Sequence, residues 1–139
     1  MSITHFVVLN WYLFVMLAVV VGLLVSGPLR QKLLGVENVG TGQAIQIVNH
    51  KAGVFVDVRE AQEYTAGHIP KARNIPLSRM AQPGPELAKL KDRPVVLYCR
   101  SGQRSARAAA LLRKQGFTSV YNLAGGFTHW QNENLPSER

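Results

Sequence analysis

The chain contains a single cysteine, and it lies in a short polar loop between a strand-like and a helix-like segment. Residues 95–98 (Val-Val-Leu-Tyr) show no polar alternation, which is typical of a strand buried on both faces. Residues 105–115 are rich in helix formers, with Ser105 expected as the N-cap and Gly116 as the stop. The sequence therefore predicts that Cys99 lies at the carboxyl end of a strand, just before a helix begins.

Such a loop can activate a cysteine. Its successive backbone N–H groups can point inward and hold an anion at the helix N-terminus. Positive potential from the helix dipole and from Arg100 and Arg104 favours the thiolate, which is the nucleophilic form. We expect Cys99 to be catalytic, with an anion-binding loop made of Arg100, Ser101, Gly102, Gln103 and Arg104.

The loop sequence Cys-Arg-Ser-Gly-Gln-Arg-Ser resembles the active-site loop of the rhodanese (sulfurtransferase) family, in which the cysteine carries a persulfide. Phosphatases that share the family's fold have five residues between the cysteine and the arginine, whereas four separate Cys99 from Arg104. The shorter loop forms a smaller cradle, which suits a sulfur atom better than a phosphoryl group with three oxygens. The spacing therefore favours sulfur transfer over phosphoryl transfer.

Four further stretches extend the resemblance over about residues 36–135. They are Asp-Val-Arg at 57–59 followed by Glu-Tyr at 63–64, Gly-His-Ile-Pro at 67–70, Asn-Ile-Pro at 74–76, and Leu-Ala-Gly-Gly-Phe-Thr-His-Trp at 123–130. Lys71 stands where the family usually has glycine. The resemblance implies a rhodanese-like α/β domain, with a small parallel sheet and helices on both faces.

Three residues outside the loop are expected to support it. Asp57 and Arg59 should form an ion pair that braces the loops around the site. His68, between glycine and an Ile-Pro pair, is expected to fix a turn by a side-chain hydrogen bond rather than to act as a base.

Strand-like and helix-like pieces alternate after residue 36, which predicts a parallel sheet covered on both faces. Strands are expected at 36–39, 54–58, 72–75, 95–98 and 119–123. Helices are expected from an N-cap at Thr41, over 60–64, from Glu86, over 105–115 and over 127–133. Ligands of such sheets bind at the carboxyl ends of the strands, where Cys99 falls.

The N-terminal part of the chain predicts a membrane anchor. Phe6 to Val25 contains no charged residue and is long enough to span a bilayer as one helix. Gly27-Pro28 is expected to end that helix. The chain is thus divided into an anchor and linker over 1–35 and a rhodanese-like domain over 36–139. Arg30 and Lys32 follow the span, so the positive-inside rule predicts a single-pass inner or plasma membrane protein with a cytoplasmic C-terminal domain.

Composition limits the other classes. The formal charge is +8, but the basic residues are scattered, which argues against nucleic acid and favours anionic headgroups or small anions. One cysteine excludes an intramolecular disulfide, and the histidines do not cluster with acidic residues, so no metal or cofactor is expected.

The expected function is a membrane-anchored sulfurtransferase. Cys99 accepts sulfur from a small anionic donor such as thiosulfate and passes it to a thiol or protein acceptor. One alternative is a membrane-tethered interaction module that docks a membrane protein, with no essential catalysis. Another is a cysteine-based phosphatase or an arsenate-reductase-like enzyme.

Overall fold

The computed structural model describes residues 2–33, 35–82 and 84–139. The chain divides into two compact units, Met1–Leu33 and Leu34–Arg139. The first unit holds two helices, α1 (Ile3–Leu9) and α2 (Trp11–Leu33). Large apolar side chains along both helices are exposed.

The N-terminal unit differs from the sequence expectation in two ways. The apolar run is broken at Asn10, whose backbone N–H and side-chain Nδ2 both donate to the carbonyl oxygen of Phe6, at 3.1 and 2.8 Å. An asparagine side chain competes with the helix for backbone groups, which accounts for a break here. The expectation that Gly27-Pro28 ends the helix is wrong, because α2 continues to Leu33.

The continuous spanning helix predicted over residues 6–25 is therefore not present as such. Among the described residues, no single helix has the length and apolar character needed to cross a membrane. The segments Ile3–Leu9 and Trp11–Gly27 meet that requirement only as a pair, bent by 72°.

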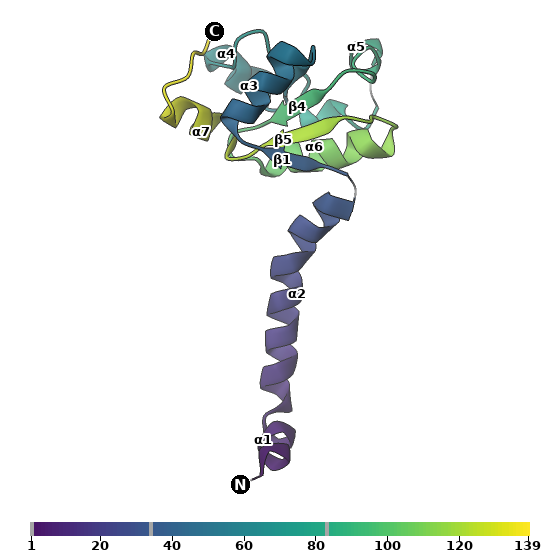
Figure 1. Cartoon of the computed structure of the whole chain (residues 1–139), viewed down its shortest axis with the longest axis vertical. Helices are drawn as coiled ribbons and strands as arrows, with labels where there is room; N and C mark the ends of the chain where they lie inside the picture. Colours follow the sequence, from purple (N-terminus) through teal and green to yellow (C-terminus); the bar gives the residue numbers. More distant parts are fainter. Residues whose placement is uncertain (1, 34, 83) are drawn as a thin grey trace. The chain divides into compact units, whose positions relative to one another are not determined.

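The second unit is built on a parallel sheet of five strands in the order β1-β5-β4-β2-β3 (Figure 1). The strands are β1 (Glu37–Val39), β2 (Val54–Asp57), β3 (Arg73–Asn74), β4 (Val95–Tyr98) and β5 (Val120–Leu123). The helical segments are α3 (Thr41–His50), α4 (Ala61–Ala66), η1 (Leu77–Arg79), α5 (Pro85–Ala88), α6 (Gln103–Lys114) and α7 (Gly126–Asn132). The predicted parallel α/β sheet is confirmed, with β4 at its centre.

Alternate residues of the central strands serve two cores, one on each face of the sheet. Val56 and Leu97 pack with Ala108 and Leu112 of α6. Phe55 and Tyr98 belong to the opposite core, which includes residues of α3 and α7. All four residues of β4 are buried, as expected for a strand covered on both faces.

Two predicted helix caps are wrong. The N-cap of α3 is Gly40, and Thr41 is the first helical residue, with its hydroxyl donating to Glu133. The N-cap of α6 is Gly102, so the helix begins at Gln103 and Ser105 lies inside its first turn. In both cases a glycine takes the cap and the hydroxyl bonds to a residue far away in the sequence.

Candidate active site

Cys99 follows β4 directly and is 1% exposed. The loop then turns through Gly102, which has a φ of +106°. This conformation suits glycine and directs the Gly102 N–H to Cys99 Sγ, at 3.0 Å. The hydroxyl of Ser105 donates to the same sulfur at 3.5 Å. The sulfur is thus surrounded by donors at the start of α6.

These donors decide the protonation of the thiol. Burial raises the pKa of Cys99, but the Ser105 hydroxyl and the backbone N–H groups of Ser105, Gly102 and Ser101 favour the thiolate. Their combined effect outweighs burial, and the pKa of Cys99 is lowered. A thiol of lowered pKa at a helix N-terminus is an activated nucleophile.

Ser105 is the site residue that the sequence reasoning missed. Its side chain is completely buried, and its hydroxyl also donates to Asn122 Oδ1 of β5. Asn122 in turn donates through Nδ2 to the Gly102 carbonyl at 3.2 Å and to Asn38 Oδ1 at 3.1 Å. Because Ser105 has one hydroxyl proton, the sulfur and Asn122 Oδ1 share a single donor. Asn122, a polar residue within the otherwise apolar strand Val120–Leu123, is the signal that could have revealed this pair.

The two loop arginines lie in different surroundings. Arg100 is exposed, whereas Arg104 makes a bidentate ion pair with Glu63 of α4, at 2.8 and 3.0 Å. Arg104 holds the pKa of Glu63 down at about 2. The sequence predicts that Arg104 belongs to the anion-binding loop, but its guanidinium instead connects the loop to α4. Ser101 and Gln103 are exposed beside it.

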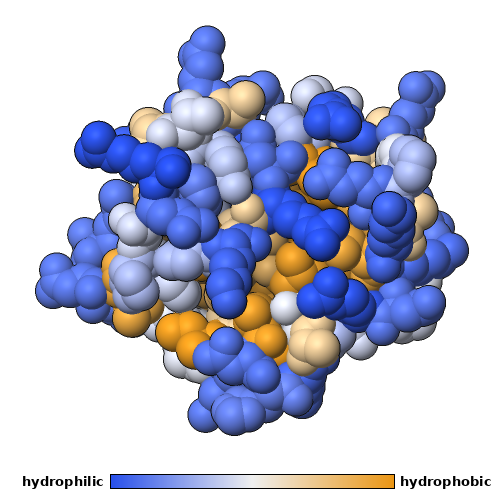
Figure 2. Space-filling model, turned by 90° about the horizontal axis from the view of Figure 1, so that it is seen from above, coloured by the Kyte–Doolittle hydropathy of each residue, from blue (hydrophilic) through white to orange (hydrophobic). Residues whose placement is uncertain are grey.

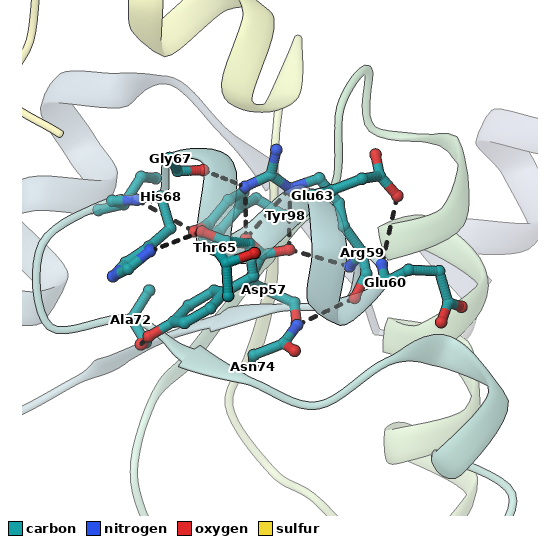
Figure 3. A network of polar contacts seen from close by, with 12 residues as sticks. Asp57, Arg59, Glu60, Glu63, Thr65, Gly67, His68, Ala72, Asn74 and Tyr98 are labelled. Atoms are coloured by element: carbon teal, nitrogen blue, oxygen red, sulfur yellow. Dashed lines mark hydrogen bonds and ion pairs between the residues drawn. The ribbon is translucent and has the colours of Figure 1, made fainter. Parts of the chain in front are cut away.

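The ion pair expected between Asp57 and Arg59 is present and buried (Figure 3). The Arg59 guanidinium bonds both carboxylate oxygens, at 2.7 to 3.1 Å, and also donates to the Gly67 carbonyl at 2.7 Å. The Arg59 Cζ atom lies over the ring of Phe127, 4.5 Å from the centroid. Burial lowers the pKa of Arg59, but Asp57 more than compensates and the pKa is raised. Arg59 therefore stays charged and connects β2, the end of α4 at Gly67, and α7.

His68 fixes a turn, as the sequence predicts. Its Nδ1 lies 2.8 Å from the Tyr64 carbonyl, and its ring stacks on the Tyr64 ring with centroids 3.7 Å apart. The Nε2 atom faces Glu138 at 3.4 Å. Both ring nitrogens are thus occupied by groups other than the Cys99 sulfur.

The start of α7 holds the other side of the cysteine loop. The N–H of Phe127 donates to the Cys99 carbonyl at 2.8 Å, and the N–H of Thr128 donates to the Arg100 carbonyl at 3.1 Å. This approach depends on Gly126, since a Cβ atom there would lie 2.5 Å from the Cys99 carbonyl oxygen. Gly126 also has a φ of +59°. The sequence motif at 123–130 contains this glycine, but it does not reveal that the glycine packs against the loop.

A surface pocket of about 410 Å³ opens beside the loop. Arg59, Arg100, Phe127, Thr128 and Gln131 are among its lining residues. Within the described part of the chain, no group of three or more His, Cys, Asp or Glu side chains is arranged to hold a metal ion.

Fold and loop together define a class of protein: a small α/β domain that presents an activated cysteine at the carboxyl end of its central strand. The chain belongs to the rhodanese-like domain family, whose model matches residues 41–133.

Similar proteins include sulfurtransferases and proteins without known function. The thiosulfate sulfurtransferase GlpE of Pseudoalteromonas translucida is 33% identical over 95 residues, which cover 68% of this chain and 89% of GlpE. The uncharacterized protein YqhL of Bacillus subtilis is 49% identical over 81 residues, which cover 58% of this chain and 63% of YqhL. The alignment thus does not cover more than a third of YqhL.

A solved structure from Rhodopseudomonas palustris has the same fold, with a TM-score of 0.65 and 28% identity over 75% of this chain and 86% of that chain. It is described as a protein of unknown function and a possible tyrosine phosphatase.

Proposed function

We propose that the protein is a sulfurtransferase that carries sulfur as a persulfide on Cys99, taking it from a thiosulfate-type donor and passing it to a thiophilic acceptor. The proposal rests on one observation: the Cys99 sulfur accepts hydrogen bonds from the Gly102 N–H and the Ser105 hydroxyl. These donors stabilise the Cys99 thiolate, and in the persulfide the negative charge lies on the terminal sulfur, at the mouth of the same loop.

In the first half-reaction the Cys99 thiolate attacks the outer sulfur of the donor. A bond forms between Cys99 Sγ and that sulfur, and the sulfur–sulfur bond of thiosulfate breaks. Sulfite leaves with the bonding electron pair. The exposed guanidinium of Arg100 is the loop cation available to attract the donor anion, since Arg104 is bound to Glu63.

In the second half-reaction a nucleophile, such as cyanide or a thiolate of a small molecule or protein, attacks the terminal sulfur of the persulfide. The Cys99 thiolate leaves with the electron pair of the broken sulfur–sulfur bond and is ready for another cycle. The same N–H and hydroxyl donors stabilise this leaving group, so the loop serves both half-reactions.

Loop length supports sulfur over phosphoryl transfer. Only four residues separate Cys99 from Arg104, and the Arg104 guanidinium is held by Glu63 rather than directed to an oxyanion. A cysteine phosphatase needs room and donors for three phosphoryl oxygens. The protein should therefore show no phosphate-ester hydrolysis.

We further propose that the N-terminal unit anchors the protein in the inner or plasma membrane, with the rhodanese-like domain in the cytoplasm. Supporting this are the uncharged run from Phe6 to Val25 and the basic residues Arg30 and Lys32 after it. The protein should remain in the membrane fraction after alkaline extraction. A protease should reach the domain in inverted vesicles and not in right-side-out vesicles; the opposite pattern would reverse the proposed topology.

The catalytic proposal is tested on the full chain in detergent. Incubation with thiosulfate, followed by intact mass spectrometry, should show the gain of one sulfur atom, which cyanide then removes. The Cys99→Ser variant should gain none, while Thr118→Ala, at an exposed position outside the cysteine loop, should behave as the parent. If neither thiosulfate nor a persulfide donor loads the parent chain, catalysis is refuted. A Cys99→Ser chain that keeps a membrane-protein partner would then support the interaction module.

A further inference from the structure

A second pocket lies away from the cysteine loop. It has a volume of about 560 Å³ and includes Gly53 and Val54, at the start of β2. Cys99 follows the opposite end of the neighbouring strand β4, in which Val95 pairs with Val54. Four strand residues of roughly 3.3 Å each separate the two ends, so the Gly53–Val54 end of the pocket is more than about 10 Å from the reacting sulfur.

The walls of this pocket are apolar. Ile45 and Val48 come from α3, Phe55 from β2, Ile69 from the following loop and Trp130 from α7. The Trp130 Nε1 donates to the Pro136 carbonyl at 2.8 Å, so its polar edge is already satisfied. The volume lies within the range of small-molecule sites, which bury an apolar body against such walls. Figure 2 shows, on the face seen from above, hydrophobic surface in a hollow bordered by hydrophilic side chains.

The charged side chains of the pocket are all cations, and Asn49 adds a neutral polar side chain. Lys71, Arg73 and Arg93 line it, and its lining residues include no aspartate or glutamate. Across the described residues, no carboxylate forms an ion pair with any of these three side chains. Arg93 uses its Nε to bind the Ala52 carbonyl at 2.9 Å, which fixes the guanidinium at the rim. The nearby Glu138 faces His68 and accepts from the Lys71 backbone N–H.

We propose that this pocket binds a soluble organic anion that has an apolar aliphatic or aromatic body and a carboxylate-type head group. The body lies against Phe55 and Trp130, and the head group contacts Lys71, Arg73 and Arg93. Three cations without a carboxylate partner give the site a positive potential, and the apolar walls strengthen each contact by excluding water. The site is independent of Cys99 and of sulfur transfer.

The test uses the full chain in non-ionic detergent, with Trp11→Phe so that Trp130 is the only tryptophan. Octanoate is the probe, and octan-1-ol and octylamine are analogues with the same chain and a neutral or cationic head. Octanoate should change the Trp130 fluorescence saturably. A variant with Lys71, Arg73 and Arg93 all replaced by Gln should bind it at least about tenfold more weakly, since each charge-assisted contact contributes about 1.5–3 kcal/mol.

The matched control replaces Lys89, Lys91 and Lys114, three exposed lysines outside the pocket, by Gln and removes the same net charge. It should leave octanoate affinity within about twofold of the parent. The single variant Lys71→Glu, at an exposed position, keeps the test valid if the triple variant unfolds. It should weaken octanoate and strengthen octylamine.

Three results would overturn the proposal. The first is an equal response to octanoate and octan-1-ol, which means simple apolar partition. The second is an equal loss of affinity in the two triple variants, which means that net charge alone attracts the anion. The third is a response to vesicles of anionic lipid but none to octanoate, which identifies a lipid surface instead of a soluble ligand.

Discussion

Replacing Ser105 with alanine tests the activation of the cysteine most directly. The hydroxyl is completely buried and lies 3.5 Å from Cys99 Sγ. Alanine removes this donor but keeps the Ser105 and Gly102 backbone N–H groups. A hydrogen bond to a charged acceptor contributes about 1.5–3 kcal/mol, and this long contact to sulfur should lie at the lower end. One pKa unit corresponds to about 1.4 kcal/mol, so the pKa of Cys99 should rise by about one unit.

The assay is the rate of alkylation by iodoacetamide as a function of pH. Cys99 is the only cysteine, so the rate reports a single site. At neutral pH the thiolate fraction, and with it the alkylation rate, should fall by up to about tenfold in Ser105→Ala. Ser105→Thr keeps a hydroxyl and should retain most of the parent behaviour. Ser101→Ala changes an exposed side chain in the same loop and should not move the midpoint.

Stability must be followed in parallel, because Ser105 also satisfies Asn122 Oδ1. Leaving that buried oxygen without a donor should cost about 1–3 kcal/mol of unfolding free energy. A folded Ser105→Ala protein whose alkylation midpoint equals or lies below that of the parent would refute the reasoning. The backbone N–H groups alone would then account for the lowered pKa.

Three further substitutions test the supports of the site. Gly126→Ala should lower the free energy of unfolding by at least about 2 kcal/mol and slow Cys99 alkylation, because the added Cβ meets the Cys99 carbonyl oxygen at 2.5 Å. Gly42→Ala is the control without a clash, and it should keep or raise stability because Gly42 lies in α3 with open space around it. A stable, reactive Gly126→Ala protein contradicts the packing argument. Glu63→Gln should make the free energy of unfolding, measured in urea, less sensitive to acid. In the folded protein the pKa of Glu63 is about 2, below its ordinary 4.5, so the ionised carboxylate stabilises the fold. This stabilisation is complete above pH 4.5 and is lost as the pH falls toward 2. If the Glu63→Gln variant is as acid-sensitive as the parent, solvent screens the ion pair between Glu63 and Arg104 and the pair adds little to stability. Lys71→Gly should raise the free energy of unfolding by roughly 0.5–1 kcal/mol, because Lys71 has a φ of +65°, which glycine adopts without strain. Lys71→Ala is the control, since it removes the long side chain but keeps the backbone strain. An equal gain of stability in both variants would exclude a backbone cause.

The sequence predicts most of the domain because its signals are local. Val95 to Tyr98 is an uninterrupted apolar run, and the structure has a strand over those four residues, buried on both faces. Asp57 and Arg59 are two positions apart, so their pairing needs no knowledge of the fold. The transition from strand to helix around Cys99 is likewise evident from the residue types alone.

The remaining features depend on partners distant in the sequence. From the sequence alone, Ser105 is a reasonable N-cap, because a serine hydroxyl near a helix start commonly accepts a hydrogen bond from a backbone N–H. Only the fold shows that Asn122 of β5 lies beside it and accepts its hydroxyl proton. Arg104 looks like a substrate ligand until Glu63, 41 residues earlier, is placed against it. Asn10 interrupts an apolar run by a single polar residue, and hydropathy does not reveal that its side chain competes for the Phe6 carbonyl.

The strand order has a consequence for synthesis on the ribosome. β1, the first strand of the domain, pairs only with β5, the last strand, and the N–H groups of α7 bind the carbonyls of the cysteine loop. A nascent chain that has emerged only as far as residue 115 already contains Cys99, but it lacks β5 and α7. The edge of β4 that receives β5 is then open, and the loop has only part of its hydrogen bonds. The domain must therefore complete its folding after nearly all of it has left the ribosome, and the thiol is fully activated only at that late stage.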